Sequence, residues 1–313
     1  MQHFSSTDVA LLIVELIPVV TFGLAGDRVA RIGDRWPRWF RTLLPVVCVL
    51  PYAFLSSSHH MFFWKWFALY SILPVVLTAL LNTAAASDPD QRGTWQDALI
   101  LLVLGLAVDL RWIEPAWPAG LAGLGKLLLV DAALYAFVVV RKLQGTGFDF
   151  RFRRGQDKTA DWKTGLRELL FFAPIVIGLG LALGFIHPHT NSQAFSIFPK
   201  PTFLLTWIYI FIFVAVPEEL FFRAWVQNLL ERRLSLYFDP IKARRSALVI
   251  ASILFGLSHF NKRLLAGAHF NWRYVILATI AGIFYGRAWR ENRRVPASSI
   301  THASVDTIWT IWF

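Results

Sequence analysis

The sequence has very little cysteine and little charge. Its single cysteine, Cys48, excludes an intramolecular disulfide and any metal site built from several cysteines. Charged residues make up 16% of the chain, against about 25% in an average soluble domain, and hydrophobic residues make up 56%. The apolar residues come in long runs between short basic loops, and a run of about 18 or more is typical of a membrane span. The sequence therefore predicts an integral membrane protein.

Three signatures of membrane proteases are also missing. The sequence contains no His-Glu-x-x-His zinc motif, no Gly-x-Ser-x-Gly serine elbow and no Gly-x-Gly-Asp pair of catalytic aspartates. Cys48 has no histidine nearby in the sequence. If the chain has a catalytic site, glutamate and histidine are the residues that remain for it.

The apolar residues fall into ten segments, all of which we expect to be helices. Lipid cannot satisfy backbone polar groups, and the sequence lacks the alternating pattern of a membrane barrel. The predicted fold is an all-α, polytopic bundle of about ten membrane-embedded helices. These segments cover residues 7–25, 40–57, 64–86, 96–110, 119–140, 168–187, 203–230, 246–260, 275–289 and 297–313.

The net charge of +11 could indicate a nucleic-acid partner. The basic residues, however, follow the loops: those after odd-numbered segments hold 23 of the 31 Lys and Arg residues, and the alternate loops hold seven. The positive-inside rule explains this bias, places the odd-numbered loops in the cytoplasm and puts both termini outside. We therefore expect a lipid bilayer and no nucleic acid as partner.

The longest polar stretch, residues 141–167, is predicted to be a basic cytoplasmic linker that touches anionic lipid. It separates an N-terminal transmembrane region of unknown role, residues 1–140, from a C-terminal half, residues 168–313. The candidate chemistry lies in that second half.

Glu218, Glu219 and Arg223 lie inside the seventh apolar segment. An ionisable residue at membrane depth indicates a functional site, because its burial costs several kcal/mol without compensation. Glu219 and Arg223 stand in the favourable i,i+4 order, so this pair can neutralise itself. We then expect Glu218, which points about 100° away on the helix, to act as a general base.

Two histidines in later segments complete the pattern. Phe255 and His259 share a helix face, and so do His302 and Asp306, where the carboxylate can fix the histidine tautomer. At about 1.5 Å per helical residue, Glu218 and His259 should lie near mid-depth. His302 should lie nearer the cytoplasm unless the last helix is displaced.

In these residues the chain resembles the CAAX-protease and bacteriocin-processing family of intramembrane endopeptidases. That family carries Glu-Glu-x-x-x-Arg, then Phe-x-x-x-His, then His-x-x-x-Asn or Asp, and the same order appears here over about 165–313. The resemblance implies that residues 168–313 form a protease domain whose helices enclose a hydrophilic cavity within the bilayer.

The resemblance also implies roles for the individual residues. Glu218 and His259 would activate a water for attack on a peptide carbonyl, His302 and Asp306 would stabilise the oxyanion, and Glu219 and Arg223 would hold the helix geometry. An ionised Asp306 would repel an oxyanion. Asp306 therefore either carries a proton or only orients His302.

Several alternatives stay open from the sequence. Glu218, His259 and His302 could ligate zinc, although a glutamate-type mechanism without a cofactor is favoured. The expected substrate is a membrane-associated or lipid-modified peptide, and the expected location is the bacterial inner (plasma) membrane. The rival hypothesis is a non-catalytic scaffold, an immunity factor or a proton-coupled transporter.

Overall fold

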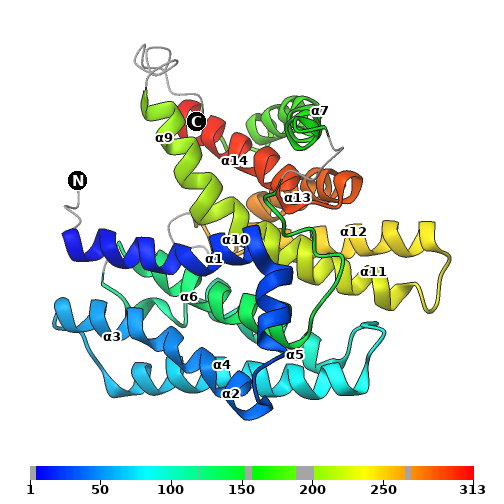
Figure 1. The fold of residues 1–313 in the computed structure, drawn as a ribbon. Coiled ribbons are helices and arrows are strands. Elements are labelled where there is room, and N and C mark those ends of the chain that lie inside the picture. Colours follow the sequence, from blue (N-terminus) through cyan, green and yellow to red (C-terminus); the bar gives the residue numbers. More distant parts are fainter. Residues whose placement is uncertain (1–4, 119, 152–156, 188–200, 265–268) are drawn as a thin grey trace. The chain divides into compact units, whose positions relative to one another are not determined.

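The computed structural model describes residues 5–118, 120–151, 157–187, 201–264 and 269–313 (Figure 1). In these ranges the chain is mostly helical and contains no strand, so the predicted all-α membrane bundle is confirmed. Each of the ten apolar segments is helical over most of its described length. Among the described residues, six helical runs are long and apolar enough to cross a membrane, and a count of ten spans is therefore not confirmed. These six are Ser6–Gly33, Arg38–Ser58, Trp64–Ser87, Ala122–Val140, Ala160–Ala182 and Thr202–Leu234.

The chain forms two compact units. The first comprises Met1–Gln144 with Asp149–Arg151, and the second comprises Gly145–Phe148 with Phe152–Phe313. In the first unit, α1 packs against α3 and α6, and α4 packs against α3, α5 and α6. The helices of this unit are α1 (Ser6–Gly33), α2 (Arg38–Leu43), α3 (Val49–Ser58), α4 (Trp64–Ser87), α5 (Trp95–Asp109) and α6 (Ala122–Leu134).

Polar side chains fix the ends of helices in the first unit. Thr94 and Asp97 form a reciprocal capping box at the start of α5. Asp97 also accepts hydrogen bonds from the buried guanidinium of Arg141, which binds Asp88 just after α4. Arg141 thereby ties the end of α4 to the start of α5.

In the second unit, α13 packs against α7, α12 and α14, and α14 also packs against α7 and α9. The apolar side chains between these helices form the core of the unit. The helices are α7 (Ala160–Ala182), α9 (Pro201–Ile210), α10 (Val216–Glu219), α11 (Asn228–Leu234), α12 (Pro240–Leu257), α13 (Trp272–Asn292) and α14 (Val295–Trp312).

Helix α7 begins earlier than the sequence predicted. It starts at Ala160, inside the stretch 141–167 that was expected to be a linker. Its first two turns carry Asp161, Lys163 and Arg167, so an apolar pattern cannot reveal them. The described part of the loop therefore ends before Ala160, and the polar turns belong to the helix.

Two glycines allow close approach of the helices that carry the predicted site. A Cβ atom on Gly256 of α12 would lie 2.6 Å from the carbonyl oxygen of Val275 on α13. A Cβ atom on Gly165 of α7 would lie 3.0 Å from the carbonyl oxygen of Ala297 on α14. Neither position has room for a side chain, so the backbones themselves set the helix spacing.

Candidate active site

Glu218 and Glu219 lie in α10, a short α-helical stretch between two π-helical runs, Phe211–Ala215 and Leu220–Gln227. The π-helix is rare and occurs frequently at functional sites. The side chain of Glu218 is 24% exposed, whereas that of Glu219 is fully buried. The two neighbouring carboxylates thus occupy different environments.

The carboxylate of Glu219 contacts both the guanidinium of Arg223 and the imidazole of His302. Its Oε2 accepts a hydrogen bond from Nε of Arg223 at 2.9 Å, and its Oε1 lies 2.9 Å from Nδ1 of His302. Arg223 is also fully buried, and its Nη1 donates to the side-chain oxygen of Gln227 at 3.4 Å. A buried carboxylate needs such compensation, and the contact with Nδ1 fixes the orientation of the His302 ring.

The other ring nitrogen of His302 faces two more carboxylates. Its Nε2 lies 3.9 Å from Oε2 of Glu218 and 3.5 Å from Oδ2 of Asp306. His302 therefore lies beside Glu218. Counting residues from the membrane surface had instead predicted that His302 would lie nearer the cytoplasm than Glu218. The structure brings the first and last of the three sequence motifs together at this imidazole.

His259 follows the last turn of α12. Its Nδ1 lies 2.8 Å from the carbonyl oxygen of Phe255 and 3.1 Å from Oγ of Ser258. When Nδ1–H donates to that carbonyl, a neutral imidazole presents Nε2 as an acceptor. The Phe255 ring lies between the two histidines, with centroid distances of 4.9 Å to His259 and 5.7 Å to His302.

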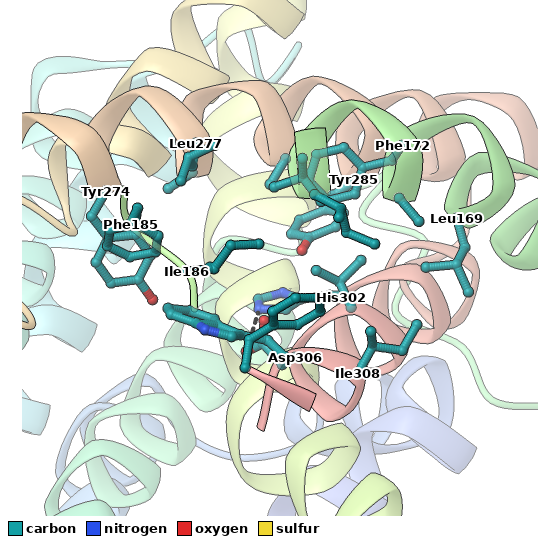
Figure 2. Close-up of a pocket in the computed structure, with 18 of the residues that line it drawn as sticks. Leu169, Phe172, Phe185, Ile186, Tyr274, Leu277, Tyr285, His302, Asp306 and Ile308 are labelled. Carbon is teal, nitrogen blue, oxygen red and sulfur yellow. Dashed lines mark ion pairs between the residues drawn. The ribbon is translucent and has the colours of Figure 1, made fainter. Parts of the chain in front are cut away.

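A cavity of about 720 Å³, including the open space at its mouth, adjoins these residues (Figure 2). Apolar side chains from α7, α13 and α14 form most of its wall. His259, His302 and Asp306 line the same cavity. The site therefore combines an apolar chamber with a group of polar side chains.

Sequence reasoning missed two tyrosines of α13 that also line the cavity. The ring of Tyr285 stacks on His302, with centroids 4.5 Å apart and an interplanar angle of 13°. The ring of Tyr274 contacts His259 edge-on at 4.7 Å. Tyr274 and Tyr285 are eleven residues apart, about three helical turns, so they share one face of α13. That spacing was the signal available in the sequence.

Within the described ranges, no group of three or more His, Cys, Asp or Glu side chains is arranged to hold a metal ion. Of the three possible zinc ligands, Glu218, His259 and His302, both histidines use Nδ1 for other contacts. Only their Nε2 atoms could take part in ligation.

Comparison with known proteins identifies the class. Residues 200–308 match the family described as Type II CAAX prenyl endopeptidase Rce1-like. The matched range contains all three motifs, from Glu218 to Asp306, and the resemblance to the CAAX-protease family is confirmed for this part of the chain. Residues 200–308 are thus similar to a family of membrane endopeptidases, and the chain is an integral membrane protein. Searches of curated proteins and of solved structures found no match.

Proposed function

We propose that this protein is an intramembrane endopeptidase that hydrolyses a peptide bond of a membrane-associated substrate, with a water activated by Glu218 and His259. One observation carries the proposal: Glu219 holds His302 so that its Nε2 faces Glu218 at 3.9 Å, beside an apolar cavity. Ionisable groups converging on a pocket are the usual mark of an active site.

In the first step, water binds between Glu218 and His259. Glu218 takes a proton from the water, whose oxygen forms a bond to the peptide carbonyl carbon. Nε2 of His259 accepts a hydrogen bond from the same water, which is the role left to it by the contact between Nδ1 and the Phe255 carbonyl. The carbonyl oxygen becomes negative as the tetrahedral intermediate forms.

In the second step, His302 stabilises this oxyanion through Nε2–H. Glu219 and Arg223 position His302 through Nδ1, and Asp306 orients the ring from the other side. The C–N bond then breaks, and the proton held by Glu218 passes to the leaving amine. The reaction consumes one water and uses no oxidant or reductant.

The mechanism as proposed takes no step through a metal. The alternative is zinc held by Glu218, His259 and His302, with water as a fourth ligand. Treatment of the purified protein with 1,10-phenanthroline, followed by metal analysis, separates the two. Unchanged turnover without bound metal supports the glutamate-type mechanism, and stoichiometric zinc lost together with activity contradicts it.

We further propose a membrane-associated or lipid-modified peptide as substrate and the bacterial inner membrane as location. The mostly apolar wall of the cavity supports a hydrophobic substrate segment. The basic loops suit a cytoplasmic face with anionic lipid. Fractionation of cells that produce the tagged protein tests the location directly.

The central test is a peptide-cleavage assay in proteoliposomes. Glu218→Gln keeps the size of the side chain but cannot accept the proton, and His259→Ala removes the acceptor. Each substitution should lower kcat by about 10²–10⁴, the usual contribution of general acid–base catalysis. Glu114→Gln, at a partly exposed glutamate of the first unit, is the matched control and should keep wild-type turnover. Full turnover by both variants contradicts the proposal, and a folded wild-type protein without turnover favours the scaffold alternative.

A further inference from the structure

Because residue 306 is an aspartate, few hydrogen-bond donors are available to the oxyanion of the tetrahedral intermediate. The ionised carboxylate of Asp306 only accepts hydrogen bonds, whereas a developing oxyanion needs donors. The one N–H that His302 offers at Nε2 already faces Glu218 at 3.9 Å and Asp306 at 3.5 Å. A second donor facing the cavity would relieve this competition.

Tyr285 carries such a donor. Tyr285 is 2% exposed and lines the cavity, and a buried tyrosine hydroxyl usually has a hydrogen-bond partner, which a substrate bound in the cavity would supply. Figure 2 shows this hydroxyl directed toward His302 and Asp306 at the cavity.

The sequence of α13 explains why the hydroxyl reaches the cavity. Ala278 and Ala281 precede Tyr285 by seven and four residues, so all three lie on one face of the helix. Side chains of a helix lean toward its N-terminus, which places the Tyr285 ring over these two small residues. All three line the cavity, and the alanines leave the space into which the hydroxyl points.

We propose that Tyr285 is a catalytic residue whose O–H donates a hydrogen bond to the carbonyl oxygen of the scissile peptide as that oxygen becomes negative. The inference rests on the proposed peptidase function. As the water oxygen bonds to the carbonyl carbon and Glu218 takes the proton, the carbonyl π electrons move to oxygen. The Tyr285 hydroxyl keeps its own proton and returns to its starting state when the C–N bond breaks.

The first experiment compares Tyr285→Phe with the wild-type protein in the proteoliposome assay. Loss of one oxyanion donor should lower kcat by about 10²–10³ and leave KM nearly unchanged. Affinity for a peptidyl phosphonate, whose tetrahedral centre imitates the intermediate, should fall by a similar factor. Affinity for a product peptide should not change. Tyr237→Phe, at an exposed tyrosine outside the cavity, is the matched control with wild-type values.

The second experiment distinguishes a donor from a packing residue. Asp306→Asn adds an N–H beside His302, so Tyr285→Phe should reduce kcat less in that background than in the wild-type protein. An equal loss in both backgrounds, together with a lower thermal midpoint, assigns Tyr285 to packing and overturns the inference. A loss with Tyr274→Phe but none with Tyr285→Phe overturns it as well.

The outcomes for Glu218 keep the two proposals apart. If Glu218→Gln is inactive and Tyr285→Phe retains the wild-type kcat, the donor role is wrong and the peptidase mechanism stands. If Glu218→Gln and His259→Ala are both active, the mechanism is wrong and the role of Tyr285 fails with it.

Discussion

Nδ1 of His302 lies 2.9 Å from Oε1 of Glu219, although 83 residues separate the two in the sequence. The second glutamate of the Glu-Glu pair therefore supports a histidine on α14 as well as the arginine one turn away. This contact makes Glu219 a positioning residue for the proposed oxyanion donor. The effect of Glu219 on activity can be separated from its effect on stability.

Replacing Glu219 by Gln should reduce both stability and activity. The substitution leaves the fully buried guanidinium of Arg223 without its anion, and breaking a buried ion pair costs about 3–5 kcal/mol. The double variant Glu219→Gln/Arg223→Met removes both charges and should recover most of the thermal midpoint. It should stay at least about tenfold less active, because the anion that orients the His302 ring is still missing. Recovery of full activity would show that Glu219 does not act through His302.

Gly256 should not tolerate a side chain. A Cβ atom there would lie 2.6 Å from the Val275 carbonyl oxygen, so Gly256→Ala must push α12 away from α13. We expect a loss of about 1–3 kcal/mol in stability, as for other overpacked sites, and lower turnover because His259 follows the same helix. Gly178→Ala on α7 is the control, since a Cβ there meets nothing within 4 Å. Thermal unfolding in detergent and the cleavage assay measure both effects. Equal midpoints for the two variants would contradict this account of helix spacing.

Lowering the pH should destabilise the first unit, because Asp88 then becomes protonated. Burial raises the pKa of Asp88, but hydrogen bonds from the Arg92 amide, the Arg141 guanidinium and the Gly93 amide bring it below its usual range. A lowered folded-state pKa stabilises the fold above the unfolded value of about 3.9, and this stabilisation is lost as pH falls through the folded-state pKa.

The matched variant for this prediction is Asp88→Asn. At pH 7 it should be less stable by about 1.5–3 kcal/mol, the usual worth of a hydrogen bond to a charged group. Its thermal midpoint should depend less on pH below 4 than that of the wild-type protein. Parallel pH profiles for the two proteins would contradict the role given to Asp88.

Glu15 of α1 should be dispensable for stability. It is buried, and neither carboxylate oxygen has a hydrogen-bond partner among the described residues. Replacing an unsatisfied buried polar group by an apolar one of similar size removes a penalty of about 1–3 kcal/mol, so Glu15→Met should raise the thermal midpoint. Glu168 is equally buried but pairs with Arg287 at 3.2 Å, so Glu168→Met should lower it. A lower midpoint for Glu15→Met would point to a cation or partner that Glu15 binds.

Apolar runs were enough to predict the helices but not the number of spans. Helix α5 has 15 residues and is too short to count as a span by length, although its sequence is strongly apolar. Helix α7 was predicted too short, because charged residues interrupt the apolar pattern in its first turns. Hydropathy records composition along the chain, whereas the end of a helix depends on local caps and packing.

The residues of the candidate site could be predicted from the sequence, but their contacts could not. Helical spacing predicted the pairing of Glu219 with Arg223, since both lie on one helix. The contacts of His302 with Glu218 and Glu219 depend on how α14 packs beside the α10 region, which no periodicity reports. Tyr285 was missed because an apolar helix face with tyrosines looks like ordinary core.

The π-helical run after the glutamates, Leu220–Gln227, has a consequence for how this segment can evolve. A π-helical turn accommodates one more residue than an α-helical turn, and each residue rotates the chain by about 100°. Deleting a single residue from this run would turn Glu218 and Glu219 relative to everything that follows. Insertions and deletions should therefore be far rarer here than substitutions, even though most of the side chains in the run are apolar.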